Sequence, residues 1–145
     1  MDVVLQNGGH LGSNLGVVEL TVALRKVFGP EENNKILFDV GHQAYVYKIL
    51  TDREKEFKTI RMYKGIGPFL DPKESKEDHF ISGHAGSALS AGCGMAVGDK
   101  DSRVIVVVGD ASIANGHSLE ALNNMAKIKN IIVVLNDNED RKSVV

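Results

Sequence analysis

The chain is short of cysteine, of long apolar runs and of excess positive charge, and each shortage excludes a class of protein. Its single cysteine, Cys93, cannot form an internal disulfide, offers no zinc site and fits a reducing compartment. The longest wholly apolar runs, Val104–Val108 and Ile131–Leu135, are far below the roughly 20 residues that span a bilayer. The first residues do not place a basic segment before an apolar one. We therefore expect no membrane partner, no signal peptide and a cytoplasmic location.

The charge balance argues against nucleic acid as a partner. The 17 lysines and arginines face 19 aspartates and glutamates, and the basic residues form no run that would neutralise a phosphate backbone. An anionic small molecule stays open as a ligand. The sequence has no Gly-x-x-x-x-Gly-Lys-Ser/Thr motif, and Gly92-Cys93-Gly94 lies within a run of small residues rather than after a strand. Neither a P-loop nor a dinucleotide fingerprint is therefore present.

Short β-branched runs alternate with longer stretches of helical character, and 145 residues suffice for one domain. Three runs predict strands: residues 36–40, 103–108 and 130–135. Four stretches predict helices: residues 14–28, 43–51, 87–97 and 117–128. The fold class is therefore α/β, a parallel sheet with helices on both faces. Ligands of such sheets bind beyond the carboxyl ends of the strands.

Local signals predict how the helices begin, end and pack. Ser13 or Asn14 is expected to cap the first helix, which is apolar on most faces and stops at Gly29-Pro30. Residues 87–97 are mostly small, and their glycines cost helix stability of up to about 1 kcal/mol each, which close packing must offset. Residues 51–80 are charged and broken by glycine and proline, so surface turns and loop are expected there.

Two polar side chains follow neighbouring strands of the predicted sheet. Asp110 comes after the second strand, and Asn138 comes after the third, one crossover later. A carboxylate and a side-chain amide, with backbone carbonyls and water, form an oxygen-ligand set suited to Mg²⁺ that also holds a diphosphate. Backbone N–H groups near Gly109, Gly116 and His117 would bind phosphate oxygens. Either motif alone is more typical of ordinary turn residues, but the pair at this spacing favours a cation site.

Gly109-Asp110 followed by Asn136-Asp137-Asn138 resembles the thiamine diphosphate motif, in which Gly-Asp-Gly precedes an asparagine by one crossover. Longer blocks resemble, in order, those of the 1-deoxy-D-xylulose-5-phosphate synthase family: GGHLGSNLGVVELTVAL (8–24), DVGHQAYVYKILTDR (39–53), HFISGHAGSALSAG (79–92), VVGDASIANG (107–116), and LEALNNM with VLNDNE within 119–139. The second block separates this family from transketolase, which shares the fold and the general motif. The resemblance implies an incomplete thiamine diphosphate-binding domain.

The resemblance also implies roles for individual residues. Two side chains are expected to bind Mg²⁺: Asp110 and Asn138. Three histidines, each after a glycine, are expected to line the diphosphate and the substrate channel as catalytic residues: His10, His42 and His84. The expected cofactor contacts are His42, Gly83, His84, Ala85, Gly86, Ser87, Gly109, Asp110, Ala111 and Asn138. Imidazole suits this place because it donates to phosphate or hydroxyl oxygens and exchanges protons near neutral pH.

The chain departs from the family pattern in three ways. Ala111 replaces the third motif glycine and is expected to be tolerated, at a cost of about 1 kcal/mol if the backbone there has positive φ. Ala85 and Gly86 replace hydroxyl residues that many relatives carry. The chain begins inside a helix that family members extend, and residues 140–145 read Asp-Arg-Lys-Ser-Val-Val, the translation of a widely used sequencing adapter. We therefore expect residues 1–139 to be a partial binding domain followed by a non-native tail.

The activity implied by the resemblance is the condensation of pyruvate with glyceraldehyde 3-phosphate with loss of CO₂, which supplies isoprenoid, thiamine and pyridoxal synthesis. The intact parent is expected to be a homodimer. The cofactor's aminopyrimidine and its essential glutamate are expected from a second domain beyond residue 145, so the chain alone is expected to be inactive. Two alternatives stay open: the small subunit of a split transketolase, and a module that binds Mg²⁺-diphosphate without turnover.

Overall fold

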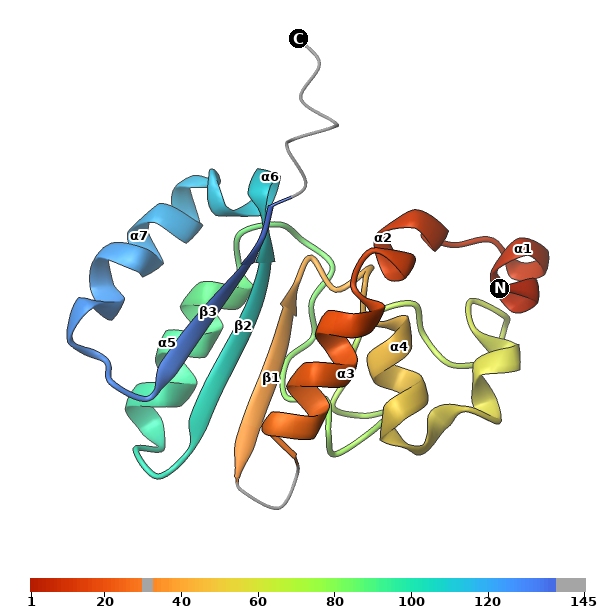
Figure 1. Cartoon of the computed structure of the whole chain (residues 1–145), viewed down its shortest axis with the longest axis horizontal. Coiled ribbons are helices and arrows are strands. Elements are labelled where there is room, and N and C mark those ends of the chain that lie inside the picture. Colours follow the sequence, from red (N-terminus) through yellow and green to blue (C-terminus); the bar gives the residue numbers. More distant parts are fainter. Residues whose placement is uncertain (30–32, 138–145) are drawn as a thin grey trace, which may run out of the picture.

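Three parallel strands form the centre of the structure, a computed structural model that describes residues 1–29 and 33–137. The strands lie side by side in the order β1 (Asn34–Asp39), β2 (Arg103–Gly109) and β3 (Ile131–Asn136) (Figure 1). Asp39 pairs with Val108, and Gly109 pairs with Asn136. Because all three strands run in one direction, their carboxyl ends meet at one edge of the sheet. The predicted strands are confirmed, with ends that differ by one or two residues.

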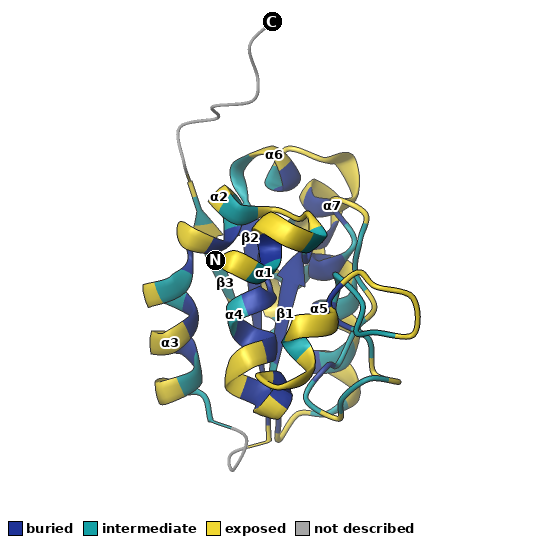
Figure 2. Ribbon diagram, turned by 90° about the vertical axis from the view of Figure 1, so that its right-hand side faces the viewer, coloured by how far each residue is buried: buried dark blue, intermediate teal, exposed yellow. Residues whose placement is uncertain are grey.

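Helices cover both faces of this sheet. On one face lie α3 (Val18–Val27) and α4 (Tyr45–Lys48), and on the other lie α5 (Ala88–Gly98) and α7 (Gly116–Asn124). The first core is formed by Leu24, Ile36, Phe38, Ala44, Tyr47, Leu70, Ile105 and Val107. The second is formed by Leu37, Ala88, Leu89, Ala96, Val104, Val106, Val108 and Ala121. The predicted α/β class with helices on both faces is confirmed, and Figure 2 shows the buried strands between partly exposed helices.

The remaining elements are short. They are α1 (Asp2–Asn7), α2 (Leu11–Leu15), α6 (Asp110–Ile113), a kinked segment (Ile49–Arg53) whose backbone is non-helical at Thr51 and Asp52, and two turns of 3₁₀-helix (Glu56–Thr59 and Met125–Lys127). No helix in the described part of the chain combines the length and the apolar character that crossing a bilayer requires. The one-turn helix α6 stands where the sequence predicted loop.

The first predicted helix is divided, and its predicted cap is wrong. The sequence favoured one helix over residues 14–28, but α2 and α3 are separate, and α3 has no side-chain cap. Asn14 lies inside α2, where its buried amide donates to the carbonyl oxygens of His10 at 2.7 Å and His42 at 2.8 Å and accepts from the Tyr45 N–H at 2.8 Å. These three bonds, two of them to distant residues, satisfy the side chain more fully than one capping bond would. Asn14 therefore joins two loops instead of starting a helix.

The small-residue helix packs against the sheet as closely as its sequence required. A methyl group built on Gly92 of α5 would come within 2.7 Å of Cγ2 of Val106, which is fully buried in β2. Valine has one preferred rotamer and little freedom to yield. The helix cost of glycine is therefore offset by close approach of backbone to strand.

A pair of alanine substitutions in α5 tests this packing. Gly92→Ala is expected to lower the free energy of unfolding by about 1–3 kcal/mol, because the added methyl overfills the contact with Val106. Gly94→Ala in the same helix meets nothing within 4 Å and is expected to raise stability by up to about 1 kcal/mol. Urea unfolding of both variants measures the two values, and equal changes of the same sign would contradict this account.

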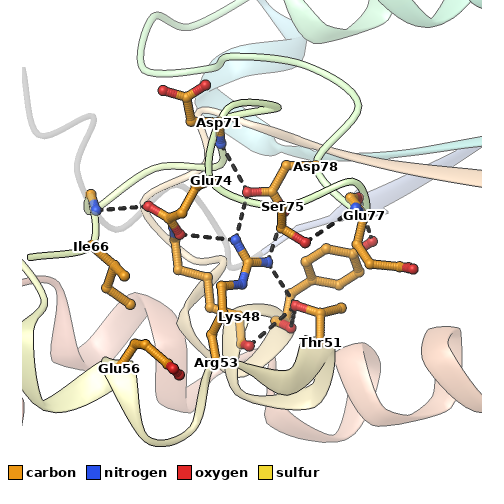
Figure 3. Close-up of polar contacts among 12 residues, drawn as sticks. Lys48, Thr51, Arg53, Glu56, Ile66, Asp71, Glu74, Ser75, Glu77 and Asp78 are labelled. Atoms are coloured by element: carbon orange, nitrogen blue, oxygen red, sulfur yellow. Dashed lines mark hydrogen bonds and ion pairs between the residues drawn. The ribbon is translucent and has the colours of Figure 1, made fainter.

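The segment predicted as surface turns contains a buried ionic network (Figure 3). The Arg53 guanidinium donates to Asp78 at 2.6 and 2.8 Å, to Glu74 at 2.9 Å and to the Thr51 hydroxyl at 2.6 Å. Lys48 also pairs with Glu74, and the side chains of Lys48 and Asp78 are fully buried. Burial lowers the pKa of Lys48 although Glu74 opposes it. Burial would also lower the pKa of Arg53, but the hydrogen bonds and charges of Asp78 and Glu74 raise it.

Tyr47 beside this network makes stability depend on alkaline pH. Its hydroxyl donates to the Glu77 carbonyl oxygen at 3.0 Å, and burial raises its pKa from 10.0 to about 12, against the lowering effect of Arg25. The pKa of Tyr47 is higher in the folded chain than in the unfolded one. Its contribution to the free energy of unfolding is therefore complete below pH 10 and is lost as the pH rises toward 12. Tyr47→Phe is expected to reduce the loss of unfolding free energy over this range by up to about 2–3 kcal/mol. Parallel pH profiles for the two proteins in urea unfolding would refute the assignment.

Candidate functional site

The carboxyl edge of the sheet brings together loops that are far apart in the sequence. Asn14 bonds the backbone at His10 to the backbone at His42, which follows β1. The loop before α5 reaches the end of β1 through Gly86, whose N–H lies 3.0 Å from the Asp39 carboxylate. A methyl group on Gly86 would lie 2.6 Å from the side chain of Asn115, so the same loop also contacts the segment after β2. Four segments thus converge at one edge, where the sequence predicted a ligand.

Asp110 stands at this edge as the first residue of α6, directly after β2. It is partly exposed, and its Oδ1 accepts a bond from the Ala111 N–H at 2.7 Å. Asn136, the last residue of β3, pairs with Gly109, so the end of β3 lies beside Asp110. Asn138, the second predicted Mg²⁺ ligand, lies outside the described residues. The adjacency of the two strands is confirmed, whereas the role of each side chain stays a prediction.

The backbone after β2 is open at its two glycines, Gly109 and Gly116. Methyl groups built on Gly109 and Gly116 would meet no atom within 4 Å. Asn115 caps α7 by accepting from the His117 N–H at 3.0 Å, which confirms the predicted helix start near His117. Ala111 has right-handed helical backbone within α6, so the methyl group that replaces the motif glycine causes no positive-φ strain. The free-energy cost that was expected if Ala111 had positive φ therefore does not arise.

Two of the three predicted histidines are in contact. The rings of His10 and His42 lie edge to face with centroids 5.0 Å apart, His10 exposed and His42 half-buried. His84 is exposed in the loop before α5, and its carbonyl oxygen accepts from the Ser87 hydroxyl at 3.1 Å. All three histidines follow glycines in loops of the same edge. The contact between His10 and His42 depends on Asn14, which the sequence had marked as a helix cap.

The donor chemistry fits a cation that is shared with a diphosphate. Mg²⁺ usually keeps several waters and takes one or two carboxylates together with phosphate oxygens, rather than a cage made by the protein alone. Within residues 1–29 and 33–137, no three His, Cys, Asp or Glu side chains gather as a metal cage. One carboxylate at Asp110 beside the open backbone of Gly109 matches the shared arrangement.

Two shallow pockets lie at the opposite edge of the sheet. They have volumes of about 240 and 300 Å³ and share Lys100, Lys129 and Asn130 in their walls. We place the site at the carboxyl edge, because parallel sheets bind ligands there and because the predicted polar residues gather there. The pockets reflect the gaps between strand starts and helix ends.

Sequence reasoning missed Asp39 and misread Asn14. Asp39 is 1% exposed, and its carboxylate accepts from the N–H groups of Gly86 and Ala88. The one signal for Asp39 was a charged residue in the otherwise apolar run 36–40, which does not show what the carboxylate binds. For Asn14 no local signal distinguishes a capping amide from one that bonds distant loops.

Comparison with solved structures shows the class of fold. A transketolase from Pichia stipitis superposes with a TM-score of 0.63 at 20% sequence identity, over 72% of this chain and 19% of that one. A second transketolase structure from the same yeast, titled as a complex with xylulose 5-phosphate, gives the same TM-score at 19% identity. At this identity the likeness defines the α/β fold and nothing finer.

Sequence comparison identifies the family. The family model described as 1-deoxy-D-xylulose-5-phosphate synthase matches residues 1–144. Curated relatives of that name are 64% identical in Fusobacterium nucleatum over 141 residues and 48% identical in Aquifex aeolicus over 146 residues, each covering 96% of this chain. The chain belongs to the 1-deoxy-D-xylulose-5-phosphate synthase family. It spans 23% of the length of these relatives.

Proposed function

We propose that this chain forms the Mg²⁺- and diphosphate-binding part of a thiamine diphosphate-dependent 1-deoxy-D-xylulose-5-phosphate synthase. The proposed parent joins pyruvate to glyceraldehyde 3-phosphate with loss of CO₂ and acts as a homodimer. One observation carries the proposal: the loops of His10, His42, His84 and Asp110 converge at the carboxyl edge of a parallel sheet. The family model and the curated relatives favour this parent over a transketolase subunit.

Each predicted residue has a task in this proposal. Asp110 and Asn138 bind the Mg²⁺ that carries the diphosphate, and the backbone of residues Gly109 to Ala111 and Gly83 to Ser87 contacts the cofactor. His10, His42 and His84 donate to phosphate or substrate oxygens and exchange protons at their ring nitrogens. When bound, thiamine diphosphate supplies the electron sink for decarboxylation. The partly exposed positions of the histidines leave their rings accessible to a ligand.

Calorimetry with the 145-residue chain tests binding. Thiamine diphosphate is expected to bind saturably in the presence of Mg²⁺, and to lose most of its affinity in EDTA. Thiamine without the diphosphate is the matched control and is expected to give no heat of binding. A chain that is folded by circular dichroism but binds neither ligand would contradict the proposal.

A decarboxylation assay separates binding from turnover. We propose that residues 1–145 bind Mg²⁺-diphosphate without releasing CO₂ from pyruvate, because we expect the activating glutamate to come from a second domain beyond residue 145. Measured CO₂ release by the chain alone would refute this second statement and leave the first intact.

A further inference from the structure

Asp39 is a buried carboxylate that is held by backbone amides. It ends β1, is 1% exposed, and accepts from the Gly86 N–H at 3.0 Å on both oxygens and from the Ala88 N–H at 3.0 Å. No lysine, arginine or histidine of the described residues forms an ion pair with it. A carboxylate buried without a cation is costly, so these amide bonds must compensate for lost hydration. The loop before α5 therefore stabilises the buried Asp39 carboxylate, and the carboxylate in turn stabilises the conformation of this loop.

Asp39 replaces the cap that α5 lacks. Ser87, the residue before α5, makes no capping bond, because its hydroxyl donates to the His84 carbonyl oxygen instead. The Asp39 carboxylate accepts from Ala88, the first residue of the helix, and its negative charge lies at the positive end of the helix dipole. The amino end of α5 is thus occupied by a side chain from β1. The Ala88 N–H is therefore already paired and is not available to a diphosphate at this edge.

The same residue fixes the loops on either side of it. Its backbone carbonyl oxygen accepts from Gln43 Nε2 at 2.8 Å, and Gln43 Oε1 accepts from the Gly41 N–H at 3.0 Å, which orders the turn that carries His42. On its other side Gly86, with φ of +88°, is seated between Asp39 and the Asn115 side chain. One aspartate thus joins the His42 turn, the His84 loop and the segment that caps α7.

We propose that Asp39 is the positioning residue of the cofactor site. It touches neither metal nor substrate, and its buried carboxylate sets the loop Gly83–Ser87 against the ends of β1 and β2 before the cofactor arrives. The proposal rests on the proposed function, since the loop is a predicted cofactor contact. It goes beyond the proposed function because it assigns the conformation of that loop to one side chain, Asp39.

Asp39→Asn is the direct test, because it keeps the shape and turns one acceptor oxygen into an NH₂ group that faces amide donors. Hydrogen exchange at the amides of Gly86 and Ala88 is expected to accelerate at least about tenfold relative to the rest of α5. The affinity for thiamine diphosphate with Mg²⁺ is expected to fall by about 10–100-fold, as for other residues that support metal sites.

Gly92→Ala is the control for general destabilisation, since it strains the middle of α5 and leaves the loop intact. Asp99→Asn, the same chemical change at the other end of α5, is the control for charge. Both controls are expected to bind as the unmodified chain does.

The outcomes are distinguishable from failure of the proposed function. Unchanged exchange at Gly86 and Ala88, or unchanged affinity despite faster exchange, would overturn the role of Asp39. If the unmodified chain binds no cofactor, the proposed function fails and with it the positioning role, while the exchange data still show whether Asp39 orders the loop. Should Asp39→Asn not fold, Gly86→Ala displaces the loop through its positive φ and its contact with Asn115, with the carboxylate kept. Full affinity in that variant would equally overturn the proposal.

Discussion

Asp110→Ala is expected to weaken the binding of thiamine diphosphate with Mg²⁺ by more than the roughly 10–100-fold typical of residues that only support a metal ligand. The reason is that Asp110 supplies the one carboxylate proposed to bind Mg²⁺, at the end of β2 beside the open backbone of Gly109. Asp101→Ala, an exposed aspartate just before the start of β2, is the matched control and is expected to leave affinity unchanged. Calorimetry of both variants measures the effect. Equal affinities would remove Asp110 from the site.

Arg53→Ala is expected to lower the free energy of unfolding by about 3–5 kcal/mol, because it leaves the fully buried Asp78 carboxylate without its charged partner. The two bonds to Asp78 and the bonds to Glu74 and Thr51 are lost together. Urea unfolding measures the change. Lys55→Ala, an exposed cation two residues away, is expected to change stability by no more than about 0.5 kcal/mol.

A double-mutant cycle separates the interaction between Arg53 and Asp78 from the contacts that each makes with other residues. Arg53→Ala with Asp78→Ala is expected to cost less than the sum of the single changes, since removing both charges leaves neither one buried alone. Additive effects would show that the salt bridge is not the source of the loss. In that case the network would act through packing of the arginine stem.

The sheet was predictable because its signal is local. The runs that became β1, β2 and β3 are short, mostly apolar and separated by helical stretches. Such runs are typical of parallel strands, and here β1 and β2 are largely buried while β3, at the edge of the sheet, is partly exposed. The small-residue helix α5 was predictable as well, and one of its glycines, Gly92, packs closely against β2 as expected. The adjacency of β2 and β3 follows from the single crossover that joins them, whereas residues 40–102 separate β1 from β2 and gave no such prediction.

The polar contacts between distant loops were not predictable in the same way. Arg53 and Asp78 look like ordinary surface charges in a lysine-rich segment, and only the folded chain shows that both side chains are buried. Asn14 carried a capping signal, but its amide bonds three backbone groups instead, two of them distant in the sequence. A local preference for capping is overridden where a buried side chain forms more hydrogen bonds with groups outside its own helix.

Only part of the candidate site could be predicted from the sequence. Spacing placed Asp110 and the end of β3 at neighbouring strand ends, and the parallel pairing of Gly109 with Asn136 agrees with that expectation. The resemblance supplied the histidines, of which His10 and His42 are in contact. Asp39 was overlooked because a carboxylate at a strand end has no sequence signature that separates a ligand from a support for backbone.

The central claim is that the ends of β2 and β3 share one cation, and paramagnetic NMR tests it most directly. Mn²⁺ would replace Mg²⁺ in the presence of thiamine diphosphate, and the amide signals that it broadens would be mapped. We expect broadening of Gly109 to Ala111 together with Asn136 to Asn138, while Lys35 and Arg103 at the other edge keep their signals. Broadening confined to one of the two strand ends, or to the opposite edge, would contradict the account.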